Sequence, residues 1–193
     1  MPELPEVQTV VDDLTSANLI GITISGARVF WPRTVAEPSP RLFCRWIKGQ
    51  KFTGIRRRGK YLVFEVADGH TMLLHLRMSG RLHLVSAKLP RNKHEHVILS
   101  FDDGRQLRFH DTRKFGRLHL LKDPERILDR LGLQPLTSDF TLKTLAQLLV
   151  HHKRLLKPLL LDQTVIAGLG NIYVDEALWE ARLHPCRPAD SLT

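Results

Sequence analysis

The chain has 193 residues, of which 42% are hydrophobic, so it can bury the core of one large domain or two small ones. No run approaches the roughly 20 apolar residues of a membrane span, which argues against an integral membrane protein. Lys and Arg number 29 against 20 Asp and Glu, a net charge of +9, which favours a polyanionic partner such as nucleic acid. The two cysteines fit neither a metal-binding spacing nor a disulfide framework, which favours a reducing, cytoplasmic setting.

The first seven residues, MPELPEV, combine a potential nucleophile with two carboxylates. Removal of the initiator methionine would make Pro2 the N-terminus. A terminal amine has a pKa of roughly 7.7–8, so part of it is neutral near neutral pH and can attack an electrophilic carbon. Glu3 is suited to moving protons beside this amine, and Glu6 to supporting it electrostatically. Pro5 and Glu6 fit a structural role equally well, because both residue types favour the first turn of a helix.

The segment after this motif has helical spacing. Val7, Val10, Val11 and Leu14 recur at intervals of three and four, which predicts an amphipathic helix over about residues 5–17. Burial of its apolar stripe would hold the N-terminus still.

From residue 20 to residue 119 the pattern is that of β structure. Two pairs of apolar runs each flank an Asp-Gly dipeptide, which is a strong hairpin signal. The runs are residues 61–66 and 71–76 around Asp68-Gly69, and residues 96–101 and 106–109 around Asp103-Gly104. Several short strands with turns between them predict an antiparallel sandwich. Residues 86–94, rich in Pro, Lys and Arg, are expected to form an exposed loop.

After about residue 122 the apolar spacing becomes helical again. The predicted helices cover residues 124–131, with Gly132 as their C-terminal stop, and then 141–151, 155–161 and 171–182. The sequence therefore predicts an α+β protein. An N-terminal helix and an antiparallel β-sandwich form the first domain over 1–122, a linker with a short helix covers 123–136, and a helical domain covers 137–193.

Basic residues gather at the entrance of one predicted strand. Arg56, Arg57, Arg58 and Lys60 lie within five residues. They could line a track of phosphates. For each arginine the alternative is a solvated basic edge that discourages aggregation of the sheet, and both interpretations stay open.

Two further segments, HLRMSG at 75–80 and DTRKFG at 111–116, follow predicted strands. An enzyme that acts on a base must take it out of the stack, and something must fill the hole. Met78 is a flexible apolar plug, Arg113 offers donors to the orphaned base, and Phe115 is a flat wedge. Taken singly, Met78 and Phe115 fit an ordinary core better.

The last motif extends from Leu156 to Glu176 and contains GLGNIYVDE. Gly168 and Gly170 permit a tight turn. Asn171 is a good helix N-cap, and the helix N-terminus behind it offers N–H groups to an anion. Asp175 is expected to be solvated or to pair with a neighbouring helix.

Together these four motifs, which span residues 2–171, resemble the formamidopyrimidine-DNA glycosylase family of base-excision repair enzymes. The resemblance implies a helix–two-turn–helix element in the helical domain. It also implies a bifunctional DNA glycosylase and AP lyase that removes oxidised purines, such as 8-oxoguanine and formamidopyrimidines. In that chemistry the Pro2 nitrogen forms a Schiff base with the sugar, which β,δ-elimination then opens.

The resemblance also implies roles for individual residues. The catalytic set is Pro2, Glu3, Glu6 and Lys60, with Lys60 holding a phosphate near the damaged nucleotide. The set expected to contact damaged double-stranded DNA is His75, Met78, Arg113, Phe115, Lys157 and Asn171. In the second set Met78, Arg113 and Phe115 replace the flipped nucleotide, whereas Lys157 and Asn171 bind phosphate.

One departure from the family concerns metal. The family continues into further helices and a cysteine-coordinated zinc finger, but this chain has no CxxC pair. Zinc is therefore expected only in a longer form, and no cofactor or metal ligand is assigned here. We expect a monomer in the bacterial cytoplasm with the chromosomal DNA. The alternatives are a non-catalytic module that binds damaged DNA, and an endonuclease VIII-type enzyme that prefers oxidised pyrimidines.

Overall fold

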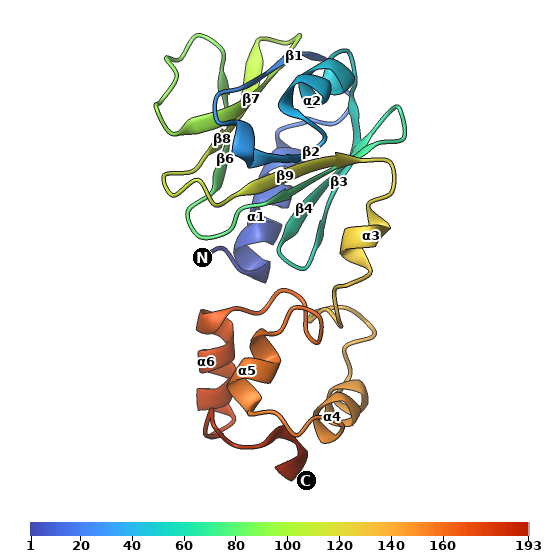
Figure 1. Cartoon of the computed structure of the whole chain (residues 1–193), viewed down its shortest axis with the longest axis vertical. Helices are drawn as coiled ribbons and strands as arrows, with labels where there is room; N and C mark the ends of the chain where they lie inside the picture. The colour runs from blue at the N-terminus through green and yellow to red at the C-terminus, as the bar shows by residue number, and fades with distance from the viewer. Residues whose placement is uncertain (193) are drawn as a thin grey trace. The chain divides into compact units, whose positions relative to one another are not determined.

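The protein is described by a computed structural model that covers residues 1–192 (Figure 1). The chain divides into two compact units, Met1–Pro124 and Glu125–Thr193. The first unit is mostly β structure and the second is helical, which confirms the predicted α+β class and the order of its parts. None of the described helices has the length and apolar character needed to cross a membrane.

Helix α1 (Leu4–Ser16) opens the first unit and buries the predicted stripe of Val7, Val11 and Leu14. Its N-cap is Glu3, whose backbone N–H donates to the Glu6 carboxylate at 2.9 Å. The Glu3 side chain faces the backbone N–H of Glu6 in return, so the two residues form a capping box. Glu6 therefore has the structural role that the sequence left open, because it stabilises the first turn of the helix.

The strands of the first unit form two sheets packed as a sandwich. They are β1 (Ile24–Val29), β2 (Val35–Glu37), β3 (Phe52–Arg58), β4 (Tyr61–Val66), β5 (Thr71–His75), β6 (Arg81–Ser86), β7 (Glu95–Phe101), β8 (Arg105–His110) and β9 (Arg117–Leu121). One sheet has the order β1-β7-β8-β6 and the other β2-β9-β5-β4-β3. Both predicted hairpins, β4–β5 and β7–β8, are confirmed as antiparallel pairs. The short strand β2 pairs parallel to β9, an exception to the predicted antiparallel pattern.

One hydrophobic core joins the two sheets and α1. It includes Phe52 and Phe64 from one sheet, Phe101 and Phe109 from the other, and Val7 from α1. The packed helix therefore holds its N-terminal end, where Pro2 and Glu3 lie, against the sandwich.

Helix α2 (Pro40–Ile47) lies within the region that the sequence assigned to β structure alone, so that expectation was wrong here. Its start has clear local causes: the Ser39 hydroxyl accepts the backbone N–H of Leu42, and Pro40 occupies the first turn. Phe43 and Ile47, four residues apart, bury one face. The helix has only eight residues, so its period was masked by the strands around it.

The second unit contains α3 (Glu125–Leu128), α4 (Leu142–Val150), α5 (Leu156–Leu161), α6 (Asn171–Glu180) and the 3-10 turn η2 (Ala189–Ser191), besides the turn η1 (Pro32–Thr34) of the first unit. Its core is built from Leu156 and Leu159 of α5, Val174 and Leu178 of α6, and Ala189. Helices α4, α5 and α6 are close to the predicted ranges, whereas α3 is shorter than the predicted 124–131.

The expected linker over residues 123–136 is partly built into the helical unit. Leu133 forms a parallel bridge with Ile166, and the Gly132 N–H donates to the Gln163 carbonyl at 3.0 Å. The prediction of Gly132 as a helix stop was wrong, because α3 ends at Leu128. Glycine is required for another reason: a Cβ at residue 132 would lie 2.2 Å from the Val165 carbonyl oxygen.

We expect Gly132→Ala to destabilise the helical unit by about 2 kcal/mol or more, since the clash is with backbone that cannot rotate away. Urea unfolding followed by far-UV circular dichroism would measure the change. Gly26→Ala is the matched control, because no atom lies within 4 Å of a Cβ there and its φ is not positive. A free energy of unfolding that is equal for the parent and Gly132→Ala would contradict this account of the glycine.

Candidate active site

The N-terminus lies at the start of α1, where the chain enters the sandwich. Glu3 is buried, with 2% of its surface exposed, whereas Met1 is 47% exposed. Pro2 is half-buried between them. The expected nucleophile is thus next to a buried carboxylate, and the residue that would mask it is accessible.

The turn between β3 and β4 is fastened to α1 by one arginine. The Arg57 guanidinium donates to the Gln8 side-chain oxygen of α1 at 2.9 Å and to the Gly59 carbonyl at 3.3 Å. Arg56 instead forms an exposed ion pair with Glu65 at 3.2 Å. Both arginines therefore have partners within the protein, and Arg57 serves to hold the turn that carries Lys60 against the helix that carries the N-terminus.

Lys60 is buried, with 5% of its surface exposed. Burial lowers the pKa of its ammonium group, and the nearby Glu3 carboxylate opposes that shift. A buried lysine is seldom an ordinary surface cation. Its position gives a positive charge, with three donors, beside the N-terminal end of α1.

His75 ends β5 and is also buried. The Arg77 backbone N–H donates to its Nδ1 at 3.0 Å, so a neutral ring carries its proton on Nε2. The Tyr61 ring packs edge-on against it, with ring centres 4.8 Å apart. The pKa of His75 is lowered to about 3, mainly by burial and in addition by the positive charges of Arg77 and Lys60. At neutral pH this side chain is an uncharged donor.

The low pKa of His75 predicts a pH-dependent stability. In the unfolded chain the pKa is near 6.5, so below that pH the unfolded state binds more protons than the folded state. The contribution of a neutral His75 to the free energy of unfolding is fully present above pH 6.5 and is lost as the pH drops toward 3. We expect the parent to lose roughly 2 kcal/mol more than His75→Asn between pH 7.5 and pH 4.5, measured by urea unfolding. Asparagine keeps an acceptor near Nδ1 without the titration, and equal losses in the two proteins would contradict the assignment.

The β5–β6 and β8–β9 loops present the expected void-filling residues to solvent. Met78 and Phe115 are each 47% exposed, so neither is a core residue. The Arg113 guanidinium stacks on the Phe115 ring, 4.9 Å from its centre. The Lys114 ammonium lies 4.1 Å from the centre of the Trp31 ring.

Sequence reasoning missed Asp111, which is fully buried between these loops. Its carboxylate accepts hydrogen bonds from the Ser79 hydroxyl and from the backbone N–H groups of Arg113 and Gly116. Although burial raises the pKa of Asp111, these hydrogen bonds outweigh it and hold the pKa below its usual value. The only signal in the sequence is an aspartate directly after the strand β8, at the start of the DTRKFG segment.

In the helical unit Lys157 and Asn171 lie on neighbouring helices. The Lys157 ammonium pairs with the Asp175 carboxylate, 2.6 Å from Oδ1, so Asp175 is an interhelical partner. Asn171 is exposed and is the first residue of α6, and the N-cap is Gly170. The prediction of Asn171 as N-cap was therefore wrong by one residue, because Gly170 supplies the carbonyl that accepts the Val174 N–H.

Hydrogen bonds of the Gln163 side chain stabilise the turn that leads into α6. The Gln163 side chain donates to the carbonyls of Leu161 and Leu169 and accepts the Gly168 N–H. Gly168 has φ +111°, which strongly favours glycine. Sequence reasoning missed this role of Gln163, although the residue is part of the quoted motif.

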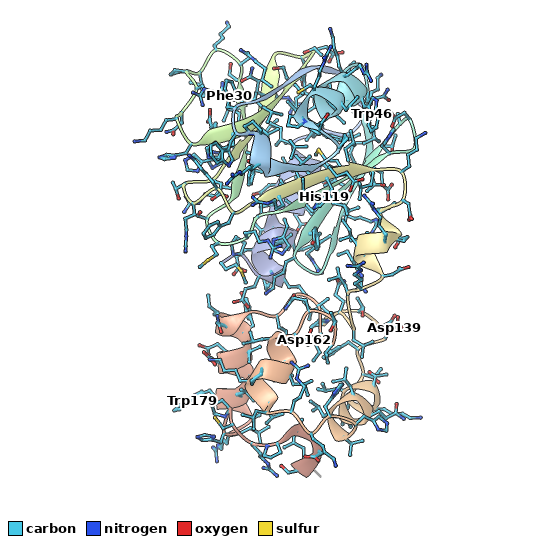
Figure 2. The ribbon with its side chains drawn as sticks, in the orientation of Figure 1. Phe30, Trp46, His119, Asp139, Asp162 and Trp179 are labelled. Atoms are coloured by element: carbon cyan, nitrogen blue, oxygen red, sulfur yellow. The ribbon has the colours of Figure 1, made fainter. Side chains whose placement is uncertain are left out.

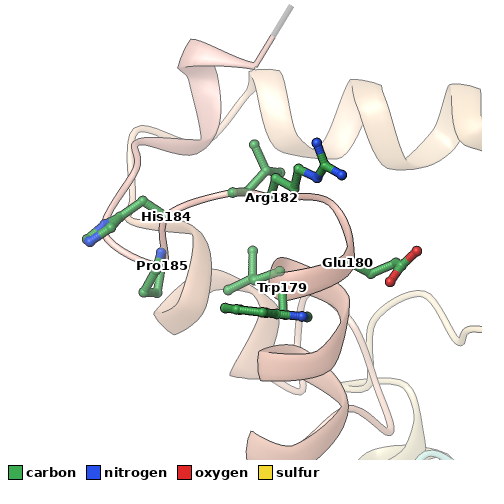
Figure 3. A pocket seen from close by; sticks show the side chains of 7 residues that line it. Trp179, Glu180, Arg182, His184 and Pro185 are labelled. Carbon is green, nitrogen blue, oxygen red and sulfur yellow. The ribbon is translucent and has the colours of Figure 1, made fainter.

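A surface hollow at the C-terminal end of α6 carries none of the expected site residues. Trp179 points outward from the helix and is 82% exposed (Figure 2). Figure 3 shows Trp179 at this hollow together with Arg182, His184 and Pro185. Because none of the expected site residues lines this hollow, we do not assign the site to it.

The structure thus brings the expected residues of the first unit into two groups. Glu3, Lys60 and His75 are buried and interact electrostatically next to the N-terminus. The exposed residues Met78, Arg113 and Phe115 come from two loops that Asp111 joins.

Comparison with known families agrees with this arrangement. The model of the formamidopyrimidine-DNA glycosylase N-terminal domain matches residues 1–118, and that of the formamidopyrimidine-DNA glycosylase H2TH domain matches residues 131–193. The chain belongs to the formamidopyrimidine-DNA glycosylase family. The predicted family and its helix–two-turn–helix element are therefore confirmed.

Curated members of the family are similar along the whole chain. The formamidopyrimidine-DNA glycosylase of Protochlamydia amoebophila is 49% identical over 192 residues, which cover 100% of this chain and 70% of that protein. The one from Roseiflexus sp. is 49% identical over 201 residues, with 100% and 71% covered.

Solved structures of the family have the same fold. A complex of the LlFpg protein with THF-DNA and an inhibitor gives a TM-score of 0.92 at 38% identity, and covers 100% of this chain and 71% of that one. Lactococcus lactis Fpg bound to DNA with an oxidised pyrimidine gives 0.92 at 39% identity, with 100% and 73% covered.

The cysteines of this family member do not fit a zinc site. Cys44 and Cys186 are free and lie in different units. Within residues 1–192 no three His, Cys, Asp or Glu side chains are grouped so that they could hold a metal ion.

Proposed function

We propose that this chain is a DNA glycosylase with AP lyase activity that acts in base-excision repair, and that Pro2 supplies its nucleophile. Membership of the family supports the reaction class. The observation that carries the assignment to residues is the buried group of Glu3, Lys60 and His75 beside the N-terminal end of α1. A non-catalytic binding module would have no need to bury a lysine and a carboxylate there.

The chemistry begins once Met1 is removed and the Pro2 nitrogen is a secondary amine. Its lone pair attacks C1′ of the damaged nucleoside, the bond from C1′ to the base breaks, and the base leaves with the bonding electrons and takes up a proton. The ring then opens to an iminium ion. Loss of a proton from C2′ expels the 3′ phosphate, and a second elimination expels the 5′ phosphate, which leaves a one-nucleotide gap.

The buried residues divide this work. Glu3 lies next to the amine and is the proposed group for proton transfer at the sugar, while Glu6 stabilises the helix start. Lys60 holds a phosphate beside the reacting nucleotide, and its lowered pKa also makes it a better proton donor. His75 donates from Nε2 to a phosphate or sugar oxygen without adding charge.

In the helical unit Lys157 and Asn171 are proposed to bind phosphates of the DNA. Asn171 is the first residue of α6, and helix N-termini favour anions. A phosphate would compete with Asp175 for Lys157.

The proposed substrates are oxidised purines and formamidopyrimidines. Solved Fpg structures bound to DNA containing Fapy-dG or N7-benzyl-Fapy-dG support this class, with TM-scores of 0.92 to this chain. Oxidised pyrimidines are a second candidate, because the Lactococcus lactis Fpg was also solved with DNA that contains one. We also propose that the protein acts as a monomer, without a cofactor, on chromosomal DNA in the bacterial cytoplasm.

Borohydride trapping on a duplex with an abasic site tests the proposed nucleophile. We expect a covalent protein–DNA adduct from protein whose intact mass shows that Met1 has been removed. Peptide mapping of the reduced adduct should locate the DNA on Pro2.

The matched control is the same chain with an uncleaved N-terminal tag, in which the Pro2 nitrogen is an amide. It keeps every side chain and is expected to bind the duplex but to give no adduct. A parent protein with a free Pro2 that binds the duplex without forming an adduct would favour the non-catalytic binding module.

A further inference from the structure

Two loops that are far apart in the sequence carry the three residues proposed to replace the flipped nucleotide. Met78 lies in the β5–β6 loop, and Arg113 and Phe115 lie in the β8–β9 loop. All three side chains are exposed, so contacts of their own side chains with the core do not fix their positions. Something else must hold the two loops in register before DNA arrives.

Hydrogen bonds to the Asp111 carboxylate connect these loops. Oδ1 accepts from the Ser79 hydroxyl of the first loop and from the Arg113 N–H, the latter at 3.2 Å. Oδ2 accepts from the Gly116 N–H at 2.8 Å. The Arg113 N–H also points at the Ser79 oxygen, at 3.2 Å, so the three residues form a closed set of hydrogen bonds. One buried carboxylate thus binds Arg113 itself and the residues directly next to Met78 and Phe115.

The backbone of Asp111 is fixed in turn by β7 and by the residue that precedes it. Its N–H donates to the His94 carbonyl at 2.9 Å. Its own carbonyl accepts from the His96 ring nitrogen Nε2 at 2.7 Å. His96 is buried, so the Asp111 backbone is held by a side chain of the protein interior.

Both loops also pack on the same aromatic ring. A Cβ added to Gly80 would lie 2.9 Å from Phe109, and one added to Gly116 would lie 2.3 Å from it. Each loop therefore approaches the ring so closely that only glycine fits. Phe109 itself is buried in the core of the sandwich.

We propose that Asp111 is a positioning residue that joins the β5–β6 and β8–β9 loops into one rigid insertion unit, so that Met78, Arg113 and Phe115 enter the duplex together. This inference rests on the proposed function, because it assigns a shared task to residues proposed to fill the void. Preorganised groups avoid the entropic cost of ordering two loops on binding. Misplacement by about 1 Å can cost roughly 100-fold in rate.

Two substrates separate positioning from folding. Excision of a damaged base from a duplex needs the void to be filled, whereas borohydride trapping at an abasic site in a single strand involves neither a void nor an orphaned base. We expect Asp111→Asn to lower duplex excision about 10- to 100-fold and to change single-strand trapping by less than about threefold. A parallel fall in both activities, or unchanged duplex excision, would overturn the proposal.

Two further variants guard against a general loss of structure. Ser79→Ala removes only the hydroxyl between the loops and should lower duplex excision selectively by about three- to tenfold. Asp103→Asn is the matched control, because Asp103 also accepts a backbone N–H, at 3.0 Å, but lies in the β7–β8 turn at the opposite end of β8 from Asp111. It should leave both activities unchanged, and a selective loss in this control would overturn the proposal.

A binding measurement separates failure of this inference from failure of the proposed function. 2-Aminopurine placed opposite a tetrahydrofuran residue reports on insertion at the void without any chemistry. The parent should change its fluorescence on binding, and Asp111→Asn at saturating protein should lose most of that change. Loss of the signal would support the insertion unit even if the parent forms no adduct, whereas an unchanged signal would overturn it even in an active enzyme.

Discussion

Lys60→Met is expected to lower base excision from a damaged duplex by about 100-fold. Lys60 is the buried cation beside the Pro2 end of α1, and removal of one preorganised charged donor from a water-poor site commonly costs 100- to 1,000-fold. Methionine matches the length of the side chain and removes its charge. Single-turnover excision kinetics on a duplex with one oxidised purine would measure the effect.

The same variant tests how Lys60 acts. If it binds a phosphate, the slope of log affinity against log salt concentration should fall by about 0.9 in magnitude. Lys48→Met is the control, because Lys48 is an exposed lysine of the same unit and no proposed role depends on it. Excision by Lys60→Met within about threefold of the parent would show that the buried lysine is only structural.

Arg113→Ala is expected to lower duplex excision by about 10- to 100-fold. The guanidinium is proposed to donate hydrogen bonds to the orphaned base, and good contacts to a base edge are worth about 1–3 kcal/mol each. The effect should depend on the base opposite the lesion and should vanish on a single strand, where no orphaned base exists. Excision assays with each of the four opposite bases would measure it.

The chain offers a close control for Arg113. The Arg91 guanidinium stacks on the Phe30 ring, 4.2 Å from its centre, much as Arg113 stacks on Phe115 at 4.9 Å. Arg91→Ala therefore also removes an exposed charge and a cation–π contact, but Arg91 lies in the β6–β7 loop and not in either insertion loop. Equal losses in Arg91→Ala and Arg113→Ala would indicate a general effect of charge on DNA affinity.

The parts that sequence predicted well are those whose causes are local. Helix α1 follows from the spacing of Val7, Val11 and Leu14, and the two hairpins follow from Asp-Gly dipeptides between apolar runs. Helix α2 was not predicted, because eight residues contain little more than two turns of the helical period. The need for glycine at position 132 was not predicted, because it comes from the backbone of Val165, which lies more than thirty positions further along the chain.

The site divides in the same way. The sequence by itself determined which residue types stand near the N-terminus and in the two loops, and the resemblance carried by these motifs gave the family. Only the tertiary structure decided that Glu6 caps a helix, that Arg57 fastens a turn to Gln8, and that Lys157 pairs with Asp175.

Exposure and long-range contact are the physical reason for this division. Met78 and Phe115 would suit a core as well as a surface, and only the packed sandwich leaves them in solvent. Asp111 and Ser79 are 32 positions apart, and no local sequence pattern predicts their hydrogen bond. Periodicity and capping act over a few residues, whereas burial depends on which segments the folded chain brings together.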